Sequence, residues 1–546
     1  SRGIQSELSE AFTFEIPGAR FHPKVKNKMW DGKIRLYNIL NGEIYAGLYE
    51  AIKEFAADRD YKLVSDYSSK MNFTADMLND ISDKLELSRE DEDGDVLPLE
   101  FREDQLDTIT VALRDKRRLI KSAVSSGKSA MIYTITRILL MMKKRVLIIV
   151  PTINLVTQLY DNFKEYSHYN KWDVDKHCHK IFKGASKITT KPVIISTWQS
   201  IYDQDAEWFE DFRCLIVDEA HEASNDLYST MMKLKYFYLR NRDNPNLPFL
   251  IFTSGTMDTK KYAEYFGLDK ENIMAVSGMS YPKTNHWHDE PVTDIKKSLI
   301  EKIMHIHKTY DDAPKKGDIM VFVNSTKPWQ KDNIKGTIEE LAHDILVVFV
   351  DRENVNGQTD DYLYATNNKP LPEGKRRQVI FATNAAETGL TVESLRFVID
   401  IGIATNSEIY FPYGFNGLVD RPVARSNVEQ RRGRCGRQFP GDFMPLYSEA
   451  AYNSLQEQQY PEIVSTGPDS IILDIIQTQQ NYKLAIKERP EFTVEDVDTL
   501  DLPPVDSLLA SLEKCLLFGY TSYNADLPTT KKSKGYGITE LGKIVL

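Results

Sequence analysis

Two series of short, continuous apolar runs constrain the fold of this chain more than any other feature. The first series occupies residues 145–151, 192–198, 214–220 and 248–255. The second series occupies residues 318–325, 345–351, 378–384 and 397–402. Because a strand that is apolar throughout must be covered on both faces, such runs alternating with helical stretches predict parallel sheets. We therefore expect an α/β fold with two parallel-sheet domains in tandem.

The chain is long enough for several domains. Its 546 residues exceed what one hydrophobic core usually organises. Residues 88–98 predict a linker, because they are acidic and carry few apolar side chains. Helical periodicity predicts a separate module at the C-terminal end. The expected parts are a small α+β N-terminal domain at 1–87, the linker at 88–98, sheet domains at 99–283 and 284–458, and a helical module at 459–546.

Composition and charge exclude few classes of function. The formal net charge is −11, from 69 Lys and Arg against 80 Asp and Glu. This acidity argues mildly against indiscriminate binding of polyanions, but nucleic-acid sites depend on where the basic groups cluster. No apolar run approaches the roughly 20 residues that a membrane-spanning helix needs, and the N-terminus lacks a signal-peptide pattern. We expect a cytoplasmic protein without membrane contact.

The sequence SSGKSA at 125–130 lies between an apolar pair and a helical stretch. A phosphate-binding loop needs inward-pointing backbone N–H groups, a glycine, a lysine for the outer phosphates and a hydroxyl for Mg²⁺. Gly127, Lys128 and Ser129 supply these groups. Ser122 stands where the usual G-x-x-x-x-G-K-[ST] pattern has its first glycine. Taken alone, the loop is equally consistent with the polar start of a surface helix.

Two carboxylates stand at the end of the third apolar run of the first series. Asp218 and Glu219 stand at the C-terminal end of that predicted strand, where ligands gather in open α/β sheets. An aspartate there can hold Mg²⁺, and the neighbouring glutamate can orient and deprotonate an attacking water. A solvated acidic strand end is the alternative for a lone pair. Together with the Gly-Lys-Ser triplet, the pair predicts nucleotide hydrolysis.

The sequence QRRGRCGR at 430–437 places four arginines around two glycines after the second series. Positive charge near the γ-phosphate stabilises the transition state of phosphoryl transfer, and it often comes from arginines of a second domain. A solvated basic helix is the alternative, which the glycines disfavour because each costs about 1 kcal/mol in a helix. The run therefore predicts a cationic contribution to the same site from Arg431, Arg432, Arg434 and Arg437.

These motifs as a set resemble those of superfamily 2 helicases over roughly residues 100–450. In order they are SSGKS, VDEAH, TSGT, ATNAAETGLT and QRRGRCGR. The resemblance implies two RecA-like domains with ATP and Mg²⁺ in the cleft between them. The implied catalytic residues are Lys128, Asp218, Glu219, His221, Gln430, Arg434 and Arg437, the last two as arginine fingers. The implied nucleotide-binding residues are Arg102, Gln105, Ser125, Ser126, Gly127, Lys128, Ser129 and Gly389. Ser129 and Asp218 would hold Mg²⁺, and Ser254 and Thr256, like His221, would couple the nucleotide state to the nucleic acid.

The second half is similar to the DEAH/RHA class and its viral relatives, in which an insertion forms a strand-separating hairpin. Residues 408–420 fit such a turn-containing element. Tyr410 and Phe411 are candidates for stacking on bases or wedging between them, with simple packing as the alternative. The C-terminal stretches resemble the winged-helix region of that class. The nucleotide preference stays open, because Val124 and Ser125 stand where the class has a glycine-rich loop.

Four hydroxyl side chains follow predicted strands. Hydroxyls and backbone amides contact phosphates without reading sequence, as a translocating motor requires. Each residue alone is equally typical of a helix cap. The expected contacts to the nucleic-acid backbone are Thr152, Thr197, Ser325 and Thr383.

Residues 18–38 are basic and carry interleaved aromatic side chains within a chain that is net negative. This pattern predicts a surface that neutralises phosphates. The alternative is a small domain whose aromatics, including Tyr37, form the core. The stretch resembles the N-terminal domain of phage UvsW-type helicases, which remodel branched DNA, and so implies duplex DNA as the partner and a phage or viral origin. The candidate contacts are Arg20, Lys24, Lys26, Lys28, Trp30, Lys33 and Arg35.

The sequence as a whole favours an ATP-dependent DNA helicase or translocase of superfamily 2. We expect movement from 3′ to 5′ on branched or forked DNA by a monomer in the cytoplasm, which is the host's if the chain is phage-encoded. An RNA helicase of the DEAH/RHA type is the alternative that the C-terminal half favours. A nucleic-acid-binding protein without motor activity is the third possibility, which the intact set of Lys128, Glu219 and Arg437 disfavours.

Overall fold

The structure is a computed structural model of residues 1–546, and it divides into two units. The first unit comprises residues 1–70 and 237–247, and the second comprises residues 71–236 and 248–546. None of the described helices is both long and apolar enough to cross a membrane. The structure describes all residues except 1, 16–30, 32, 40–41, 45–48, 64–72, 91–94, 116, 123–125, 183, 202–203, 205, 221–223, 242–246, 256, 269–271, 277, 279–280, 290–291, 311–316, 358, 388–389, 391, 393, 411–414, 438, 489 and 524–534.

The N-terminal unit is a small α+β domain. Its elements are α1 (Arg2–Ala11), β1 (Thr13–Glu15), β2 (Lys33–Arg35), β3 (Tyr37–Asn38), β4 (Glu43–Ile44) and α3 (Tyr49–Ala57). β1 pairs antiparallel with β2, and β3 pairs antiparallel with β4. Phe12, Tyr37 and Phe55 form the buried core, with the rings of Phe12 and Phe55 centred 6.2 Å apart. Tyr37 is therefore a core residue, which was the alternative to a role in binding.

The first lobe is built on a parallel sheet. Within the described residues its strand order is β13-β7-β12-β11-β8-β10-β9, and every neighbouring pair runs parallel. In chain order the strands are β7 (Arg117–Ser122), β8 (Val146–Val150), β9 (Cys178–Ile181), β10 (Val193–Thr197), β11 (Cys214–Asp218), β12 (Phe249–Ser254) and β13 (Ile273–Val276). This sheet confirms the first expected α/β domain.

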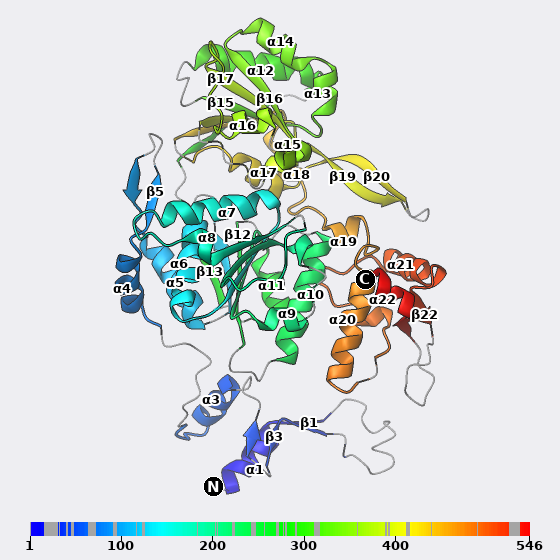
Figure 1. Ribbon diagram of the computed structural model, residues 1–546. Coiled ribbons are helices and arrows are strands. Elements are labelled where there is room, and N and C mark those ends of the chain that lie inside the picture. Colours follow the sequence, from blue (N-terminus) through cyan, green and yellow to red (C-terminus); the bar gives the residue numbers. More distant parts are fainter. Residues whose placement is uncertain are drawn as a thin grey trace. The chain divides into compact units, whose positions relative to one another are not determined.

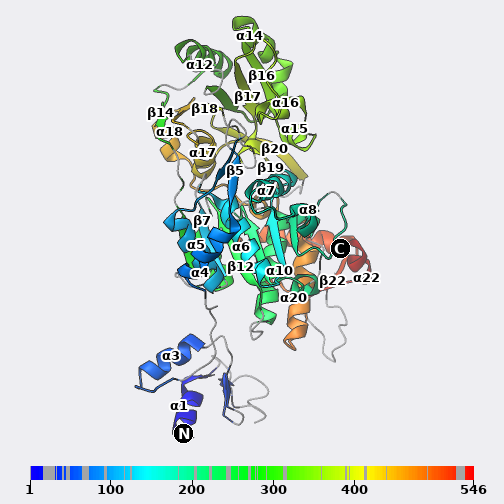
Figure 2. The ribbon, with the colours of Figure 1, turned by 60° about the vertical axis from the view of Figure 1, so that its left-hand side comes forward.

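Helices cover both faces of this sheet (Figures 1 and 2). On one face, alternate strand residues such as Val146 and Ile148 share a core with α5, α6 and α7. On the other face, Phe252 of β12 packs against Tyr262 of α11, with ring centroids 5.8 Å apart. The period-two alternation of strand side chains thus buries both faces. The helices are α5 (Glu103–Asp115), α6 (Lys128–Met141), α7 (Ile153–Tyr166), α8 (Val174–His177), α9 (Ala206–Glu210), α10 (Asn225–Arg240) and α11 (Thr259–Phe266).

Residues 88–98 differ from the expected linker. They form a hairpin of β5 (Ser88–Glu90) and β6 (Val96–Pro98) that packs against α7. Ser88 is fully buried, and its Oγ donates to the Glu165 carbonyl oxygen at 2.6 Å. The helix α4 (Ala75–Leu85) before the hairpin belongs to the same core. The acidic composition of this stretch concealed the hairpin, because a short surface hairpin needs only a few buried side chains. The first lobe therefore begins before residue 88.

The second lobe is built on another parallel sheet. Its strand order within the described residues is β14-β21-β18-β15-β17-β16, again with parallel neighbours. The strands are β14 (Lys283–Asn285), β15 (Asp318–Phe322), β16 (Ile345–Val350), β17 (Arg377–Ala382), β18 (Leu395–Asp400) and β21 (Gly441–Pro445). Packed around them are α12 (Ile295–Thr309), α13 (Lys327–Lys331), α14 (Ile334–Leu341), α15 (Arg352–Gly357), α16 (Asp360–Ala365), α17 (Arg425–Arg432) and α18 (Glu449–Ser454).

All eight predicted apolar runs coincide with strands. They correspond to β8, β10, β11 and β12 in the first lobe and to β15, β16, β17 and β18 in the second. The sequence patterns missed β9, β13, β14 and β21. Three of these are edge strands, which are covered on fewer sides and therefore carry more polar residues. The expected fold class of two tandem RecA-like domains is confirmed.

A long hairpin and a C-terminal module follow. The hairpin pairs β19 (Ile403–Tyr410) with β20 (Phe415–Pro422), which confirms a turn-containing element with wider bounds than expected. Its turn, including Phe411, lies outside the described residues. The module comprises α19 (Glu462–Ser465), α20 (Ile472–Ala485), the short helix η6 (Val494–Asp496), α21 (Val505–Leu517), β22 (Thr521–Tyr523), β23 (Tyr536–Ile538) and α22 (Glu540–Val545).

The C-terminal module contacts α10 of the first lobe through a row of carboxylates. Asp474 accepts a hydrogen bond from Ser229 Oγ at 2.7 Å and pairs with Lys233 Nζ at 3.1 Å. Asp498 accepts from the Tyr236 hydroxyl at 2.8 Å. Because α10 follows β11 in the chain, this row joins the module to the helix that comes directly after Asp218 and Glu219.

We expect Asp474→Ala to weaken the docking of the C-terminal module. The side chains of Asp474 and Lys233 are only 9% and 14% exposed, and removing one partner of a buried ion pair costs about 3–5 kcal/mol. Thermal unfolding and limited proteolysis near residues 455–461 measure the effect. The exposed Glu513→Ala in α21 is the control, and equal behaviour of the two variants would contradict the expectation.

Candidate active site

The loop between β7 and α6 lies at the carboxyl edge of the first sheet. Gly127 caps α6 with a φ of 78°, in the left-handed region that glycine adopts readily. A Cβ at this position would also overlap with the Gln105 amide. The first turn of α6 therefore presents its free N–H groups and the positive end of its dipole at this edge, as an anion-binding site requires.

Gln105 and Arg102 both reach this loop. The Gln105 amide is buried, and its Nε2 donates to the Ser126 carbonyl oxygen at 2.6 Å. Its Oε1 accepts from the Arg102 backbone N–H at 2.8 Å, and Arg102 Nη2 donates to the same Ser126 oxygen at 3.5 Å. The start of α5 is thereby fixed to the loop. A single glutamine near an arginine gave a weak sequence signal, but the fold places both residues at the loop.

Lys128 lies between the two predicted catalytic carboxylates. Its Nζ is 2.9 Å from Asp218 Oδ1 and also pairs with Glu219. Burial by itself would lower the pKa of Lys128, but the charges of Asp218 and Glu219 raise it above the ordinary value. Glu219 has a φ of 51°, which is uncommon for a residue with a side chain. The backbone is thus held in a costly conformation at the residue proposed to act on water.

Thr253 holds Asp218 from the neighbouring strand. Its hydroxyl donates to Asp218 Oδ1, and its carbonyl oxygen accepts from the Ala220 backbone N–H at 3.1 Å. The sequence motif predicts a coupling role for Ser254 and Thr256 and gives no signal for Thr253. Ser254 is fully buried at the end of β12. The pairing of β11 with β12, which no local pattern reveals, brings Thr253 to the site.

Ser129 has a partner that the sequence did not indicate. Its hydroxyl shares a hydrogen bond of 2.9 Å with the hydroxyl of Tyr166, the last residue of α7. Burial raises the pKa of Tyr166 to about 12. Asp218 and Ser129 supply the hard oxygen donors that Mg²⁺ prefers. The described residues include no cluster of three His, Cys, Asp or Glu side chains able to hold a metal.

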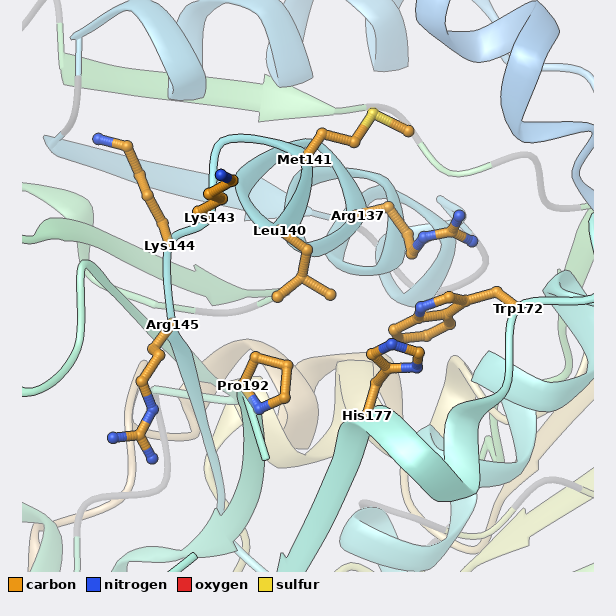
Figure 3. A pocket seen from close by; sticks show the side chains of 9 residues that line it. All are labelled: Arg137, Leu140, Met141, Lys143, Lys144, Arg145, Trp172, His177 and Pro192. Atoms are coloured by element: carbon orange, nitrogen blue, oxygen red, sulfur yellow. The ribbon is translucent and has the colours of Figure 1, made fainter. Parts of the chain in front are cut away.

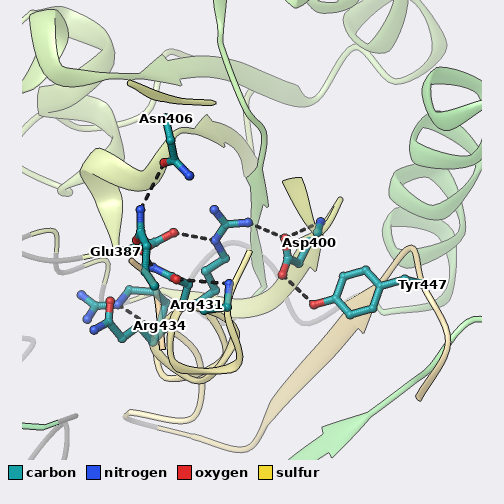
Figure 4. A network of polar contacts seen from close by, with 11 residues as sticks. Glu387, Asp400, Asn406, Arg431, Arg434 and Tyr447 are labelled. Carbon is teal, nitrogen blue, oxygen red and sulfur yellow. Dashed lines mark hydrogen bonds and ion pairs between the residues drawn. The ribbon is translucent and has the colours of Figure 1, made fainter. Parts of the chain in front are cut away.

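Arg431 of the arginine-rich motif is buried in an ion network (Figure 4). Its Nε pairs with Glu387 and its Nη1 with Asp400, each at 2.7 Å, and no part of the side chain is exposed. Asp400 also accepts from the Tyr447 hydroxyl at 2.8 Å. Arg431 therefore fixes α17 to the end of β18 and does not face a ligand.

Arg434 and Arg437 are held differently. Arg434 Nη1 donates to the Leu390 carbonyl oxygen at 3.2 Å, and Nε donates to that of Gln430 at 3.4 Å. Burial lowers the pKa of Arg434, and the charges of Glu219 and Glu387 oppose this shift. Burial, together with Arg434, lowers the pKa of Arg437 to about 9, again opposed by Glu219. Arg434 is buried and Arg437 is half-buried, and the negative charge of Glu219 acts favourably on both, so this position also favours an added anion.

Comparisons with known families agree with this arrangement. Three family models match the chain: "DNA helicase UvsW, N-terminal" at residues 1–66, "Type III restriction enzyme, res subunit" at 76–247 and "Helicase conserved C-terminal domain" at 298–438. The two lobes thus match helicase family models, in agreement with the resemblance to superfamily 2.

Individual relatives are helicases by name. The chain is 31% identical over 480 residues to "Putative RNA Helicase B962L" of African swine fever virus, covering 80% of this chain and 48% of that protein. It is 32% identical over 281 residues to "ATP-dependent RNA helicase HrpA homolog" of Haemophilus influenzae, covering 50% of this chain and 20% of the relative. The chain thus spans about half the length of the viral relative and 20% of the length of the bacterial one.

A solved structure shares the fold. The Escherichia coli DEAH/RHA helicase HrpB superposes with a TM-score of 0.57 at 18% identity, covering 74% of this chain and 48% of that chain. The likeness at this identity concerns the fold alone, and it agrees with the two parallel-sheet lobes described above.

The predicted contacts of this chain to the nucleic-acid backbone lie at strand ends, as expected. Thr152 caps α7 by accepting from the Leu155 backbone N–H at 3.3 Å, which is the alternative role weighed for it. Thr197 is buried and shares a hydrogen bond of 2.9 Å with Ser200. Ser325 and Thr383 are half-buried just after β15 and β17. Their contacts with nucleic acid stay predictions.

The N-terminal candidates are described only in part. Lys33 and Arg35 lie in β2, and Arg35 pairs with Asp31. A side-chain hydrogen bond from Arg35 lowers the pKa of Asp31 to about 2, so Asp31 partly neutralises Arg35. The side chain of Tyr410 and the whole of Arg20, Lys24, Lys26, Lys28, Trp30, Ser125, His221, Thr256, Gly389 and Phe411 lie outside the described residues.

Arg431 and Arg437 should differ in their effect on stability. Arg431→Gln leaves two buried carboxylates without their cation, which we expect to cost about 3–5 kcal/mol. Burial lowers the pKa of Arg437 to about 9, so Arg437→Gln should cost less stability than Arg431→Gln. Urea unfolding of the second lobe measures both, with the exposed Arg352→Gln as control. Equal losses at both positions would contradict this assignment.

Proposed function

We propose that this chain is an ATP-dependent helicase or translocase that acts on branched or forked DNA and moves from 3′ to 5′. The observation that carries the proposal is the position of Lys128 between Asp218 and Glu219, with the Glu219 charge acting on Arg434 and Arg437 of the second lobe. A cation, two carboxylates and two further cations are the groups that phosphoryl transfer requires.

The residues of the first lobe would bind and orient the reactants. The outer phosphates compete with Asp218 and Glu219 for Lys128, and this exchange releases both carboxylates. Glu219 can then accept a proton from the attacking water. Mg²⁺, held by Asp218 and Ser129, would supply positive charge to the phosphates. For this, the Ser129 hydroxyl must exchange its hydrogen bond with Tyr166.

The residues of the second lobe would respond to charge that develops on the γ-phosphate. Arg434 is buried, and burial strengthens its interaction with an anion. Arg437 is charged at neutral pH, because its pKa of about 9 lies above 7. The arginines favour closure of the cleft when nucleotide is bound, and their anionic partner is lost after hydrolysis. Alternation between these states would move the grip on a nucleic-acid strand.

DNA as the substrate is supported by the N-terminal domain. The family model that matches residues 1–66 is named for a DNA helicase. RNA is the second candidate, because the matched viral and bacterial relatives are named RNA helicases. We propose that the hairpin β19–β20 separates strands in either case and that the chain acts as a monomer in the cytoplasm.

Lys128→Ala and Glu219→Gln should each lower ATP turnover by about 100-fold or more, because positioned charges and general bases contribute on this order. Steady-state ATPase assays with saturating nucleic acid measure the loss. Lys260→Ala is the matched control, since the Lys260 side chain is 86% exposed. Full ATP turnover in Lys128→Ala would contradict the role of this lysine. Full remodelling activity in the same variant would favour a non-motor binding protein.

The choice of substrate is tested by ATPase and unwinding assays on forked DNA, a four-way junction, a DNA–RNA hybrid and an RNA duplex. We expect the forked and branched DNA to stimulate hydrolysis most. Stimulation by RNA alone would overturn the assignment to DNA and favour the second candidate.

A further inference from the structure

A pocket of about 460 Å³ opens at the end of α6 farthest from Lys128 (Figure 3). The helix has 14 residues and so spans about 21 Å between the two. Arg145 directly precedes β8 and Pro192 directly precedes β10, and both line the pocket. The pocket therefore lies at the amino edge of the first sheet, whereas the residues of the candidate active site lie at the carboxyl edge.

The rim of this pocket is cationic. It carries Arg137, Lys143, Lys144 and Arg145. Within the described part of the chain, no carboxylate pairs with the first three, and Arg137 donates to the neutral Asn170 Oδ1 at 3.2 Å. Arg145 pairs at 3.2 Å with Asp211, whose side chain is 70% exposed. A patch of positive charge on a chain of net charge −11 favours an acidic ligand.

The floor of the pocket is apolar and its aromatic ring is already covered. Leu140, Pro192 and Trp172 form the floor. The Arg137 guanidinium lies 4.6 Å from the centre of the Trp172 ring, and the His177 ring stacks on it at 5.3 Å. Figure 3 shows Trp172 between these two side chains. Single-stranded nucleic acid binds on open aromatic faces, whereas Arg137 and His177 cover the Trp172 ring and leave Leu140 and Pro192 as the apolar surface.

We propose that this pocket binds an acidic peptide segment of a partner protein. One aliphatic or aromatic side chain of the peptide occupies the floor, and flanking carboxylates pair with Lys143, Lys144 and Arg145. Nucleic acid fits less well, because the expected backbone contacts Thr152 and Thr197 lie at the opposite edge of the sheet. Binding of the peptide does not depend on the proposed function.

The pocket is also connected to the nucleotide loop through α6. Ser129, Tyr133 and Arg137 follow one another at intervals of four residues and so share one face of the helix. The ring of Tyr133 packs edge-on against that of Tyr166 at 5.6 Å, and Tyr166 bonds to Ser129. Any effect of the bound peptide on ATP turnover would act along these contacts. This effect, unlike peptide binding itself, rests on the proposed function.

The test measures binding of dye-labelled synthetic peptides to the full chain by fluorescence anisotropy. Each peptide has about ten residues, all Asp or Glu except a central Leu, Phe, Trp or Ser. We expect the apolar centres to bind roughly tenfold more tightly than Ser, from burial of one side chain. The double variant Lys143→Glu/Lys144→Glu should weaken binding by about tenfold or more, because it replaces attraction by repulsion.

The matched control is Lys296→Glu/Lys297→Glu, an adjacent pair in the first turn of α12, where acidic residues are tolerated. Lys297 is exposed, and Lys296 is half-buried and pairs with Asp332 at 3.7 Å. This control variant should bind the peptides like the unmodified chain. Circular dichroism and thermal unfolding verify that both variants fold. Failure of all acidic peptides to bind, or equal losses in both variants, would overturn the proposal. A single-stranded oligonucleotide is added as a competitor in the same assay. If it displaces the peptide and Lys143→Glu/Lys144→Glu also weakens the binding of that oligonucleotide, the pocket is assigned to nucleic acid instead.

Discussion

The ion cluster of Lys128, Asp218 and Glu219 is the interaction on which the candidate site depends. Lys128 opens α6 after β7, and the carboxylates end β11, which is separated from β7 only by β12. Parallel strands bring these groups together because their carboxyl ends meet at one edge of the sheet. The first turn of α6, with its free N–H groups, begins at the same edge. A nucleotide phosphate bound there, as we propose, would meet a cation, a helix N-terminus and two carboxylates at one point.

The second lobe uses its arginines in two different ways. Arg431 is neutralised by Glu387 and Asp400, and this network fixes the end of α17. Arg434 and Arg437 follow directly, and burial lowers the pKa of both. A structural ion network thus supports a neighbouring pair of cations that is costly for the fold but suited to an anion. The Glu219 charge links this pair to the first lobe.

Sequence patterns succeeded where structure depends on neighbouring residues. Continuous apolar runs gave eight strands, of which seven lie inside their sheets, because a strand covered on both faces has no polar alternation. Gly127 was recognisable because it stands directly before Lys128 and Ser129 in a phosphate-loop pattern. The hairpin β5–β6 was missed because its few buried residues, such as Ser88, stand in an acidic run. Composition averaged over that run concealed them.

The sequence by itself determined the chemical groups of the motor and the strands that carry them, since these depend on residue type and short-range periodicity. Only the tertiary structure decided their partners. Tyr166 at Ser129, Thr253 at Asp218 and the carboxylates around Arg431 come from other strands and helices. Such contacts join residues that are distant in the chain, and they follow from the strand order and the packing of helices, which no local pattern specifies.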